Sequence, residues 1–256
     1  MKIKIISSGS KANCTLVSCG STNLLIDAGP TSSFIVSELE KENISPKDIN
    51  GVIITHTHSD HIKGLKVFIK TSNSLVYITE ELLPEIIKIV PAPNIRLIDK
   101  TLILNDINIE MLEMSHDVPC NGILLNYNGK DLVYITDTGY VNKKYLPKLI
   151  NKDIYIIETN YNAKMLSEGP YPFLLQQRIR SDSGHMSNRY AGSLLSKCIG
   201  DKTKCVVLAH ISEHNNCKEL VLEEVKDEIK ELGFDENKLI LTEQNTASEM
   251  INIWLK

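Results

Sequence analysis

The sequence lacks the features of secreted, membrane-spanning and polyanion-coating proteins. No segment approaches the ~18 consecutive apolar residues of a transmembrane helix, and the apolar run behind Met1 is too short for a signal peptide. None of the six cysteines forms a C-x-x-C pair, so we expect reduced thiols and no disulfide framework. A net charge of -4 gives no general attraction to nucleic acid or membrane. We therefore expect a cytoplasmic protein whose contacts with any polyanion are local.

Low-complexity linkers, charge blocks and short repeats are also absent, and the apolar patterning alternates between strands and helices. We predict strands at 2–7, 14–18, 22–27, 52–55, 75–78, 95–98, 101–104, 107–113, 122–127, 131–136, 154–158, 205–209 and 238–241. We predict helices at 32–42, 62–71, 80–89, 142–150, 171–180, 187–198 and 218–232, and a strand or short helix within 246–253. Two mixed halves packed sheet against sheet in a single domain are the simplest arrangement of this order.

The segment Thr55–His61 carries the strongest chemical signal. It follows an apolar strand and places His56, His58, Asp60 and His61 within six positions. His56 and His58 are two residues apart in extended chain, so their side chains can point to one side. Packing does not explain such a cluster of nitrogen and oxygen ligands, and we interpret it as part of a metal site.

Three further ligands follow later strands. His116, Asp137 and His210 each stand just after the C-terminal end of a predicted strand, where loops build sites. Taken singly, the two histidines could be loop or buried residues, and Asp137 could be a turn residue before Thr-Gly. Together with the first cluster they indicate one shared metal centre.

This order of ligands resembles the metallo-β-lactamase fold superfamily, in which Asp27 of Leu-Ile-Asp-Ala-Gly would match a structural element. The resemblance implies an α/β fold: a four-layer αββα sandwich with mixed sheets, formed by residues 1–256 as a single hydrolase domain. It also implies a dinuclear centre at one edge of the sandwich. There the first metal ion would be held by His56, His58 and His116, the second by Asp60, His61 and His210, and Asp137 would bridge them.

Two divalent ions roughly 3.5–4 Å apart can lower the pKa of a shared water toward neutrality and neutralise charge on a phosphoryl or carbonyl oxygen. The resulting hydroxide would be the nucleophile, and Asp60 would orient it while binding its metal ion. Mixed imidazole and carboxylate ligands suit Zn, Mn or Fe, and the sequence does not choose among them.

Motifs outside the metal ligands resemble those of the YycJ (WalJ) family. They are Ser8–Asn13, Ile157–Asn162, Gly169–Pro172, Arg178–Asn188 and Ala209–Asn216. That family is associated with 5′-to-3′ exonuclease activity on DNA and with replication and mismatch repair. The resemblance implies a DNA substrate, replication or repair proteins as partners, and no membrane. One departure is His214, where an acidic residue is expected before Asn-Asn.

The same motifs supply candidate catalytic and substrate-binding residues. His185 is a candidate phosphate contact or proton donor to the leaving oxygen, and helix amides after Ser187 could bind an anion. The alternative is a helix-entry turn capped by Ser187 or Asn188. Glu158 and Asn160 could orient ligand imidazoles or close an ordinary turn. The expected substrate contacts are Ser8, Ser10, Asn13, Glu158, Asn160, Ser187, Asn188 and Asn215.

Two groups of lysines could follow a phosphate backbone beside the metal ions. A solvated helix face is the alternative, and we favour it for at least one group. The groups are Lys63, Lys66 and Lys70, and Lys143, Lys144, Lys148 and Lys152.

Two other functions are compatible with the same ligands. The first is hydrolysis of small esters, thioesters or lactones at the same centre. The second is a non-catalytic scaffold or sensor that binds metal within a replication or envelope-signalling complex. A substrate panel separates the three functions.

Overall fold

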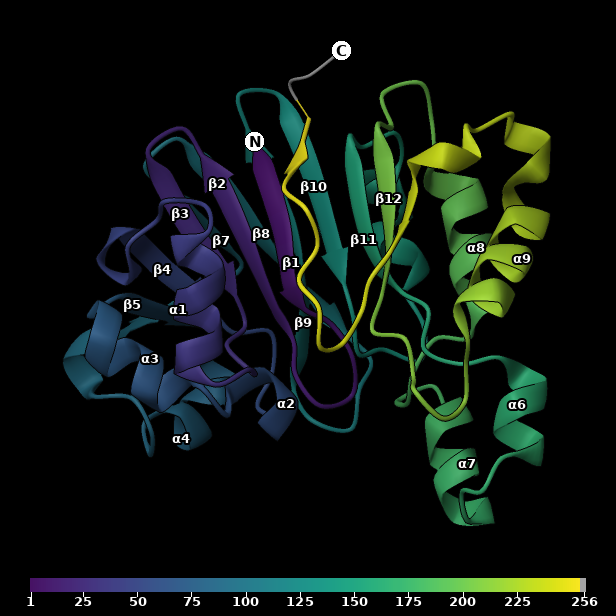
Figure 1. Cartoon of the computed structure of the whole chain (residues 1–256), viewed down its shortest axis with the longest axis horizontal. Helices are drawn as coiled ribbons and strands as arrows, with labels where there is room; N and C mark the ends of the chain where they lie inside the picture. Colours follow the sequence, from purple (N-terminus) through teal and green to yellow (C-terminus); the bar gives the residue numbers. More distant parts are fainter. Residues whose placement is uncertain (254–256) are drawn as a thin grey trace. The chain divides into compact units, whose positions relative to one another are not determined.

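The computed structural model describes residues 1–253, which divide into two compact units. Unit 1 contains Met1–Met111 and the C-terminal segment from Glu243, and unit 2 contains Leu112–Thr242. Each unit is built on a sheet with helices beside it (Figure 1). The expectation that residues 1–256 form a single domain stays a prediction.

Unit 1 contains a mixed seven-stranded sheet of order β14-β1-β2-β3-β4-β5-β6. β14, β1, β2 and β3 pair antiparallel, and β3 to β6 run parallel. The strands are β1 (Lys2–Ser7), β2 (Cys14–Cys19), β3 (Thr22–Ile26), β4 (Ile49–Ile53), β5 (Leu75–Ile78), β6 (Ile95–Leu97) and β14 (Ile251–Asn252). The helices are α1 (Ser32–Glu40), α2 (Ser59–Ile62), α3 (Leu65–Ser72) and α4 (Leu83–Ile86), with 3-10 turns at Pro46–Asp48, Glu80–Leu82 and Ala92–Asn94.

The core of unit 1 lies between this sheet and helices α1 and α3 (Figure 1). Ile35 of α1 and Phe68 of α3 are completely buried against strand residues such as Val52. The parallel pairing of β3 with β4 sets Ile26 opposite Ile53. Because both strands end there, the loops that follow them leave the same edge of the sheet.

The second sheet has the order β13-β12-β11-β10-β9-β8-β7, and the boundary between the units falls within β8. β7 pairs antiparallel with β8, and β9 with β10, whereas β10 to β13 run parallel. The strands are β7 (Thr101–Leu104), β8 (Ile107–Met114), β9 (Cys120–Tyr127), β10 (Lys130–Ile135), β11 (Ile154–Glu158), β12 (Cys205–Ala209) and β13 (Leu239–Leu241). The helices are α5 (Leu146–Leu149), α6 (Ala163–Glu168), α7 (Phe173–Arg180), α8 (Asn188–Cys198) and α9 (Lys218–Ile229), with 3-10 turns at Lys143–Tyr145, Lys230–Leu232 and Glu236–Lys238.

In unit 2, helices α8 and α9 lie side by side and pack on the parallel strands (Figure 1). Leu195 of α8 and Val225 of α9 are completely buried with Val206 of β12. Ser187 caps α8, since its hydroxyl accepts a hydrogen bond from Tyr190 N at 3.2 Å. Helices α6 and α7 share a smaller apolar cluster.

Most predicted elements are confirmed, and the corrections concern one strand and several helices. The strand predicted at 52–55 is Ile49–Ile53, so the chain from Ile54 onward already belongs to the ligand loop. The helix predicted at 62–71 is split into α2 and α3. The helix predicted at 80–89 is only a 3-10 turn and the short α4, and α6 was not predicted at all. The helix predicted at 142–150 is likewise a 3-10 turn and the short α5, whereas the strand allowed for within 246–253 is present as β14.

The cysteines form no disulfide framework, as the sequence predicts. All six cysteines are free, and burial raises the pKa of Cys205 to about 12. Within residues 1–253 we find no helix with the length and apolar character needed to cross a membrane.

Candidate metal centre

Asp27 anchors the histidine-rich loop of unit 1. It follows β3 with φ of 62°, in the left-handed region that non-glycine residues rarely occupy. Its buried carboxylate accepts hydrogen bonds from Thr55 N and Thr55 Oγ1, both at 2.9 Å, and from His61 Nδ1 at 2.8 Å. Burial raises the pKa of Asp27 above its ordinary value, although these hydrogen bonds act in the other direction. The bond to Nδ1 fixes the orientation of the His61 ring.

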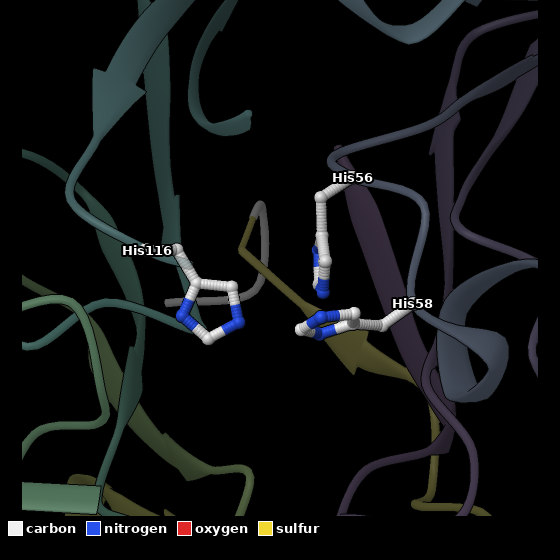
Figure 2. A group of neighbouring side chains, drawn as sticks. All are labelled: His56, His58 and His116. Atoms are coloured by element: carbon white, nitrogen blue, oxygen red, sulfur yellow. The ribbon is translucent and has the colours of Figure 1, made fainter. Parts of the chain in front are cut away.

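The side chains of His56 and His58 project from the same loop, and Figure 2 shows both imidazoles. Their ring centroids are 4.8 Å apart with planes at 79°, and the rings of His56 and His61 are 4.0 Å apart. His56 is completely buried, with Nδ1 at 3.1 Å from Thr55 Oγ1, whereas His58 is half-buried. The two-residue spacing therefore brings the rings together, as expected from the sequence.

Asn13 connects the loop after β1 to this ligand loop. Its side-chain nitrogen donates to Asp60 Oδ2 at 3.0 Å and to Gly9 O at 3.0 Å, and lies 2.9 Å from His61 Nε2. Its backbone N–H donates to Asp60 O at 2.8 Å. Asn13 is only 1% exposed. These contacts favour a role in orienting Asp60 and His61 over the direct substrate contact expected from the sequence.

In unit 2, two candidate ligands stand at the ends of parallel strands in left-handed backbone conformation. Asp137 follows β10 with φ of 57°, and His210 follows β12 with φ of 54°. Non-glycine residues in this region are each strained by about 1–3 kcal/mol, and such strain clusters at functional sites. Both side chains are buried. The strained backbone at two buried candidate ligands therefore favours a functional role for both.

Glu158, at the end of β11, joins the ligands of unit 2. Its buried carboxylate accepts hydrogen bonds from His185 Nδ1 at 2.7 Å, His210 Nδ1 at 2.9 Å, Thr138 N at 3.1 Å and Met186 N at 3.2 Å. Burial alone raises the pKa of Glu158, but His185 and the hydrogen bonds hold it below its ordinary value. Glu158 also raises the pKa of His185 against the effect of burial. The orienting role considered for Glu158 therefore has the geometry it requires.

His116 stands in the loop after β8, and its ring is also drawn in Figure 2. Its Nδ1 lies 3.1 Å from Gly184 O, and its ring centroid is 5.4 Å from that of His185. Burial lowers the pKa of His116, which favours the neutral imidazole that binds metals.

The candidate histidines share one arrangement that fits a divalent metal ion. An oxygen atom lies beside Nδ1 of four of them, and such partners fix the tautomer in which Nε2 is the metal ligand. Imidazole and carboxylate together form a donor set for divalent transition metals. In unit 2, ligand atoms of Asp137, Glu158, His185 and His210 all lie within 4.8 Å of one another. The Nδ1 partners are Thr55 Oγ1 for His56, Asp27 for His61, Gly184 O for His116 and Glu158 for His210.

The expected substrate contacts differ in accessibility. Ser10 is exposed, whereas Ser8 is buried. Ser187 is the helix cap that the sequence offered as the alternative. The Asn188 amide is buried and exchanges hydrogen bonds of 2.8 and 3.0 Å with Asn216. This burial favours a structural role for Asn188.

Asn160 and Asn215 support the loop after β12. Asn160 Nδ2 donates to His210 O at 3.0 Å, so it braces the backbone of a candidate ligand. Asn215 accepts at its backbone oxygen from Asn162 N at 2.9 Å and is 1% exposed. Contact of either residue with substrate stays a prediction.

Sequence reasoning missed Gln244, which fixes the loop between β1 and β2. Its Oε1 accepts from Lys11 N at 2.9 Å, and its backbone oxygen accepts from Ser7 Oγ at 2.5 Å. A Cβ on Gly9, whose φ is +153°, would lie 2.8 Å from the same Oε1. Gln244 lies in the C-terminal segment, and no motif marks it.

Comparisons with known proteins agree with this geometry. The model of the metallo-β-lactamase superfamily matches residues 8–210. The chain is 34% identical over 227 residues to exodeoxyribonuclease WalJ of Streptococcus pneumoniae, covering 86% of this chain and 84% of that protein. It is 33% identical over 241 residues to exodeoxyribonuclease YycJ of Bacillus anthracis, covering 91% of each.

Among solved structures, the metallo-β-lactamase fold protein YhfI from Bacillus subtilis matches with a TM-score of 0.76 at 19% identity, over 96% of this chain and 98% of that one. The mixed α/β fold class expected from the sequence is thereby confirmed, and the clusters of histidine and carboxylate indicate divalent metal binding. The chain belongs to the metallo-β-lactamase superfamily and, within it, to the family of the WalJ and YycJ exodeoxyribonucleases.

Proposed function

We propose that this protein is a metal-dependent 5′-to-3′ exodeoxyribonuclease. The observation that carries the proposal is its identity of 33–34% with two exodeoxyribonucleases over most of each chain. The oriented histidines of both units support it, because a hydrolytic metal centre needs neutral imidazoles with fixed tautomers. Nucleic acid is then the substrate, and replication or repair proteins are the proposed partners in the cytoplasm.

We further propose that two divalent ions, Zn or else Mn or Fe, bind the residues expected from the sequence. One ion would be held by His56, His58 and His116, and the other by Asp60, His61 and His210, with Asp137 between them. When bound, such ions supply a nucleophilic water at neutral pH and stabilise charge on a phosphoryl oxygen.

The protein's own residues would then set the geometry of the reaction. Asp27 and Glu158 hold His61 and His210 through Nδ1. Asn13 holds the Asp60 carboxylate that would orient the attacking water. Glu158 accepts from Nδ1–H of His185 and raises the pKa of that ring, which favours the imidazolium. The second proton of the imidazolium, on Nε2, is the one that would contact a phosphate oxygen or pass to the leaving oxygen.

The test is a panel of substrates with the metal-loaded protein. It contains 5′-phosphorylated duplex DNA, single-stranded DNA, RNA, a generic phosphodiester, and representative esters, thioesters and lactones. We expect stepwise 5′-to-3′ degradation of DNA, and loss of at least 100-fold in kcat for Asp60→Ala or His116→Ala, in line with removal of a group at a hydrolytic centre. Asp106→Ala, at an exposed turn, should retain activity.

The other outcomes separate the rival functions. Turnover of esters or lactones without DNA cleavage would identify a small-molecule hydrolase. Metal binding without turnover of any substrate would identify a scaffold or sensor. Full nuclease activity in Asp60→Ala would overturn the proposed mechanism.

A further inference from the structure

Unit 1 contains a cavity of about 280 Å³ between the loop after β1, the start of α1 and the C-terminal segment. A water molecule occupies about 30 Å³ in the liquid, so the cavity has room for a group much larger than a single water. The lining residues that matter here are Lys11, Gly29, Thr31, Lys63, Gln244 and Asn245.

The charge of the lining is of one sign. Lys11 and Lys63 both line the cavity, and the described residues that share its wall include no aspartate or glutamate. The polar residues Thr31, Gln244 and Asn245 share the lining with the apolar Pro30 and Phe34. A concave surface with two ammonium groups and neutral hydrogen-bonding groups selects an anion.

The wall of the cavity is joined directly to candidate metal ligands of the same unit. Gly29 N donates to Asn13 O at 3.0 Å, and Asn13 N donates to Asp60 O at 2.8 Å. A Cβ on Gly29 would lie only 1.7 Å from Asp60 O. Lys63 follows His61 by two residues. An anion in the cavity would therefore lie beside the Asp60–His61 segment.

The backbone at Lys11 is held in place before any ligand arrives. Its backbone N–H is held by Gln244 Oε1 at 2.9 Å, and the neighbouring Ala12 O accepts from Ser7 Oγ at 2.9 Å. Because the backbone is already ordered, only the side chain of Lys11 has to lose conformational entropy when the ligand binds.

We propose that this cavity binds a phosphate group of the DNA strand through Lys11 and Lys63, next to the reacting phosphodiester. The inference rests on the proposed nuclease function and adds a substrate-binding site to it. It also assigns different roles to members of the first lysine group, Lys63, Lys66 and Lys70. Lys63 lines the cavity, whereas Lys66 and Lys70 are exposed on α3 and do not line it.

The test compares Lys11→Ala/Lys63→Ala with the matched control Lys66→Ala/Lys70→Ala. Both double variants remove two lysines that are exposed to solvent, so both should melt close to wild type. Cleavage of duplex DNA is measured for KM and kcat, and equilibrium binding of fluorescent DNA is measured by anisotropy at several salt concentrations. For the cavity variant we expect KM to rise about tenfold or more and kcat to stay within about twofold, because the lost contacts bind substrate without touching the reacting group.

The salt dependence supplies a second readout. Loss of one phosphate contact should reduce the slope of log K against log salt by about 0.9, and the control should keep the wild-type slope to within about half that change. Two substrates then identify the source of the phosphate. If the cavity variant loses a wild-type preference for 5′-phosphate over 5′-hydroxyl ends, the cavity takes the terminal phosphate. If both substrates weaken equally, it takes an internal phosphodiester.

The inference and the proposed function fail in different ways. A cavity variant that matches the control in KM and salt slope, in a protein that cleaves DNA, overturns the inference alone. Lysine-dependent DNA binding without cleavage by wild type overturns the nuclease function and leaves the phosphate site in place.

Discussion

At the scale of single residues, the geometry of the site depends on the carboxylates that accept hydrogen bonds from the candidate ligands. Nδ1 of His61 is held by Asp27, and Nδ1 of His210 is held by Glu158. The two carboxylates are completely buried, and one carboxylate in each unit performs the same task. Sequence reasoning marked Asp27 and Glu158, but only the structure shows which imidazole each one orients.

Glu158→Gln tests this role. An amide offers one acceptor oxygen, whereas Glu158 accepts from two imidazoles and two backbone N–H groups. Oε1 accepts from both imidazoles and Oε2 from both backbone N–H groups, so in either orientation the amide NH₂ would face two donors and disturb either the two rings or the backbone beside them. We expect metal affinity or kcat to fall by about 10–100-fold, as for other orienting partners of metal ligands. Metal content by mass spectrometry and steady-state kinetics would measure the two effects.

The matched control is Glu223→Gln on the exposed side of α9, which should change neither quantity. If Glu158→Gln keeps wild-type metal affinity and kcat, the carboxylate has no orienting function.

At the scale of elements, patterning predicted strands better than short helices. The Asn128-Gly129 hairpin between β9 and β10 is confirmed, with φ of 49° and 73° at the two residues. Helix α6 has six residues and one buried side chain, Leu166, so it carries no periodic signal. It forms because Asn162 Oδ1 accepts from Lys164 N and Met165 N, at 3.0 and 2.9 Å. A cap of this kind is too common in loops to predict a helix alone.

The break between α2 and α3 is an element-scale feature that can be tested at Gly64. A Cβ there would lie 1.8 Å from Pro30 O and 3.0 Å from Ala28 O, both backbone atoms. Gly64→Ala must therefore displace the ligand loop or the segment after β3. We expect destabilisation of about 1–3 kcal/mol, as for other overpacked sites, together with weaker metal binding. Urea unfolding and metal titration would measure them.

Gly129→Asn is the control for this substitution. Gly129 has φ of +73° and nothing within 4 Å of the added Cβ, and asparagine tolerates that conformation. We expect metal binding of the control to match wild type. If Gly64→Ala and the control have the same free energy of unfolding and the same metal affinity, the segment between α2 and α3 accommodates the added Cβ without destabilisation.

At the scale of the whole molecule, the candidate ligands could be proposed from the sequence because each stands in a loop after a strand of clear pattern. The support for the ligand loops could not, because it comes from distant parts of the chain. Gln244 holds Lys11 across 233 positions. No local pattern encodes a contact of that separation, and in a single sequence it is visible only once the chain is folded.

A buried ion cluster in unit 1 predicts how stability depends on pH. Lys4 Nζ lies 2.7 Å from Glu42 Oε1 and 3.2 Å from Glu38 Oε2. Burial lowers the pKa of Lys4, but hydrogen bonds to Glu42 and Glu38 raise it above its ordinary 10.5. Burial raises the pKa of Glu38, but hydrogen bonds from Lys41 and Lys4 hold it below 4.5. The cluster therefore stabilises the fold between those values, and loses its effect as pH falls below 4.5 or rises above 10.5.

Lys4→Met should lower the free energy of unfolding at neutral pH by about 1–3 kcal/mol, because it leaves a buried acceptor without its donor. The difference from wild type should shrink as the pH falls below 4.5, because Glu38 is then protonated first in the unfolded chain and, at lower pH, in the folded protein. Lys41→Met is the control, since Lys41 is 63% exposed while contacting the same Glu38, and its effect should stay under about 1 kcal/mol. A pH-independent difference would contradict this account.

Metal binding should also stabilise the whole chain, because the proposed ligands come from both units and the unfolded chain cannot hold them in place. One ion at 100 times its Kd adds about 2.7 kcal/mol, so a chelator should lower Tm by roughly 5–10 °C for a chain of this length. Calorimetry with and without chelator measures the shift, and added Zn or Mn should restore it. Asp60→Ala should show a smaller shift than wild type, whereas Asp106→Ala should show the full one. A wild-type Tm that ignores the chelator, with metal removal verified by mass spectrometry, would mean that the ligand loops keep their structure without the ions.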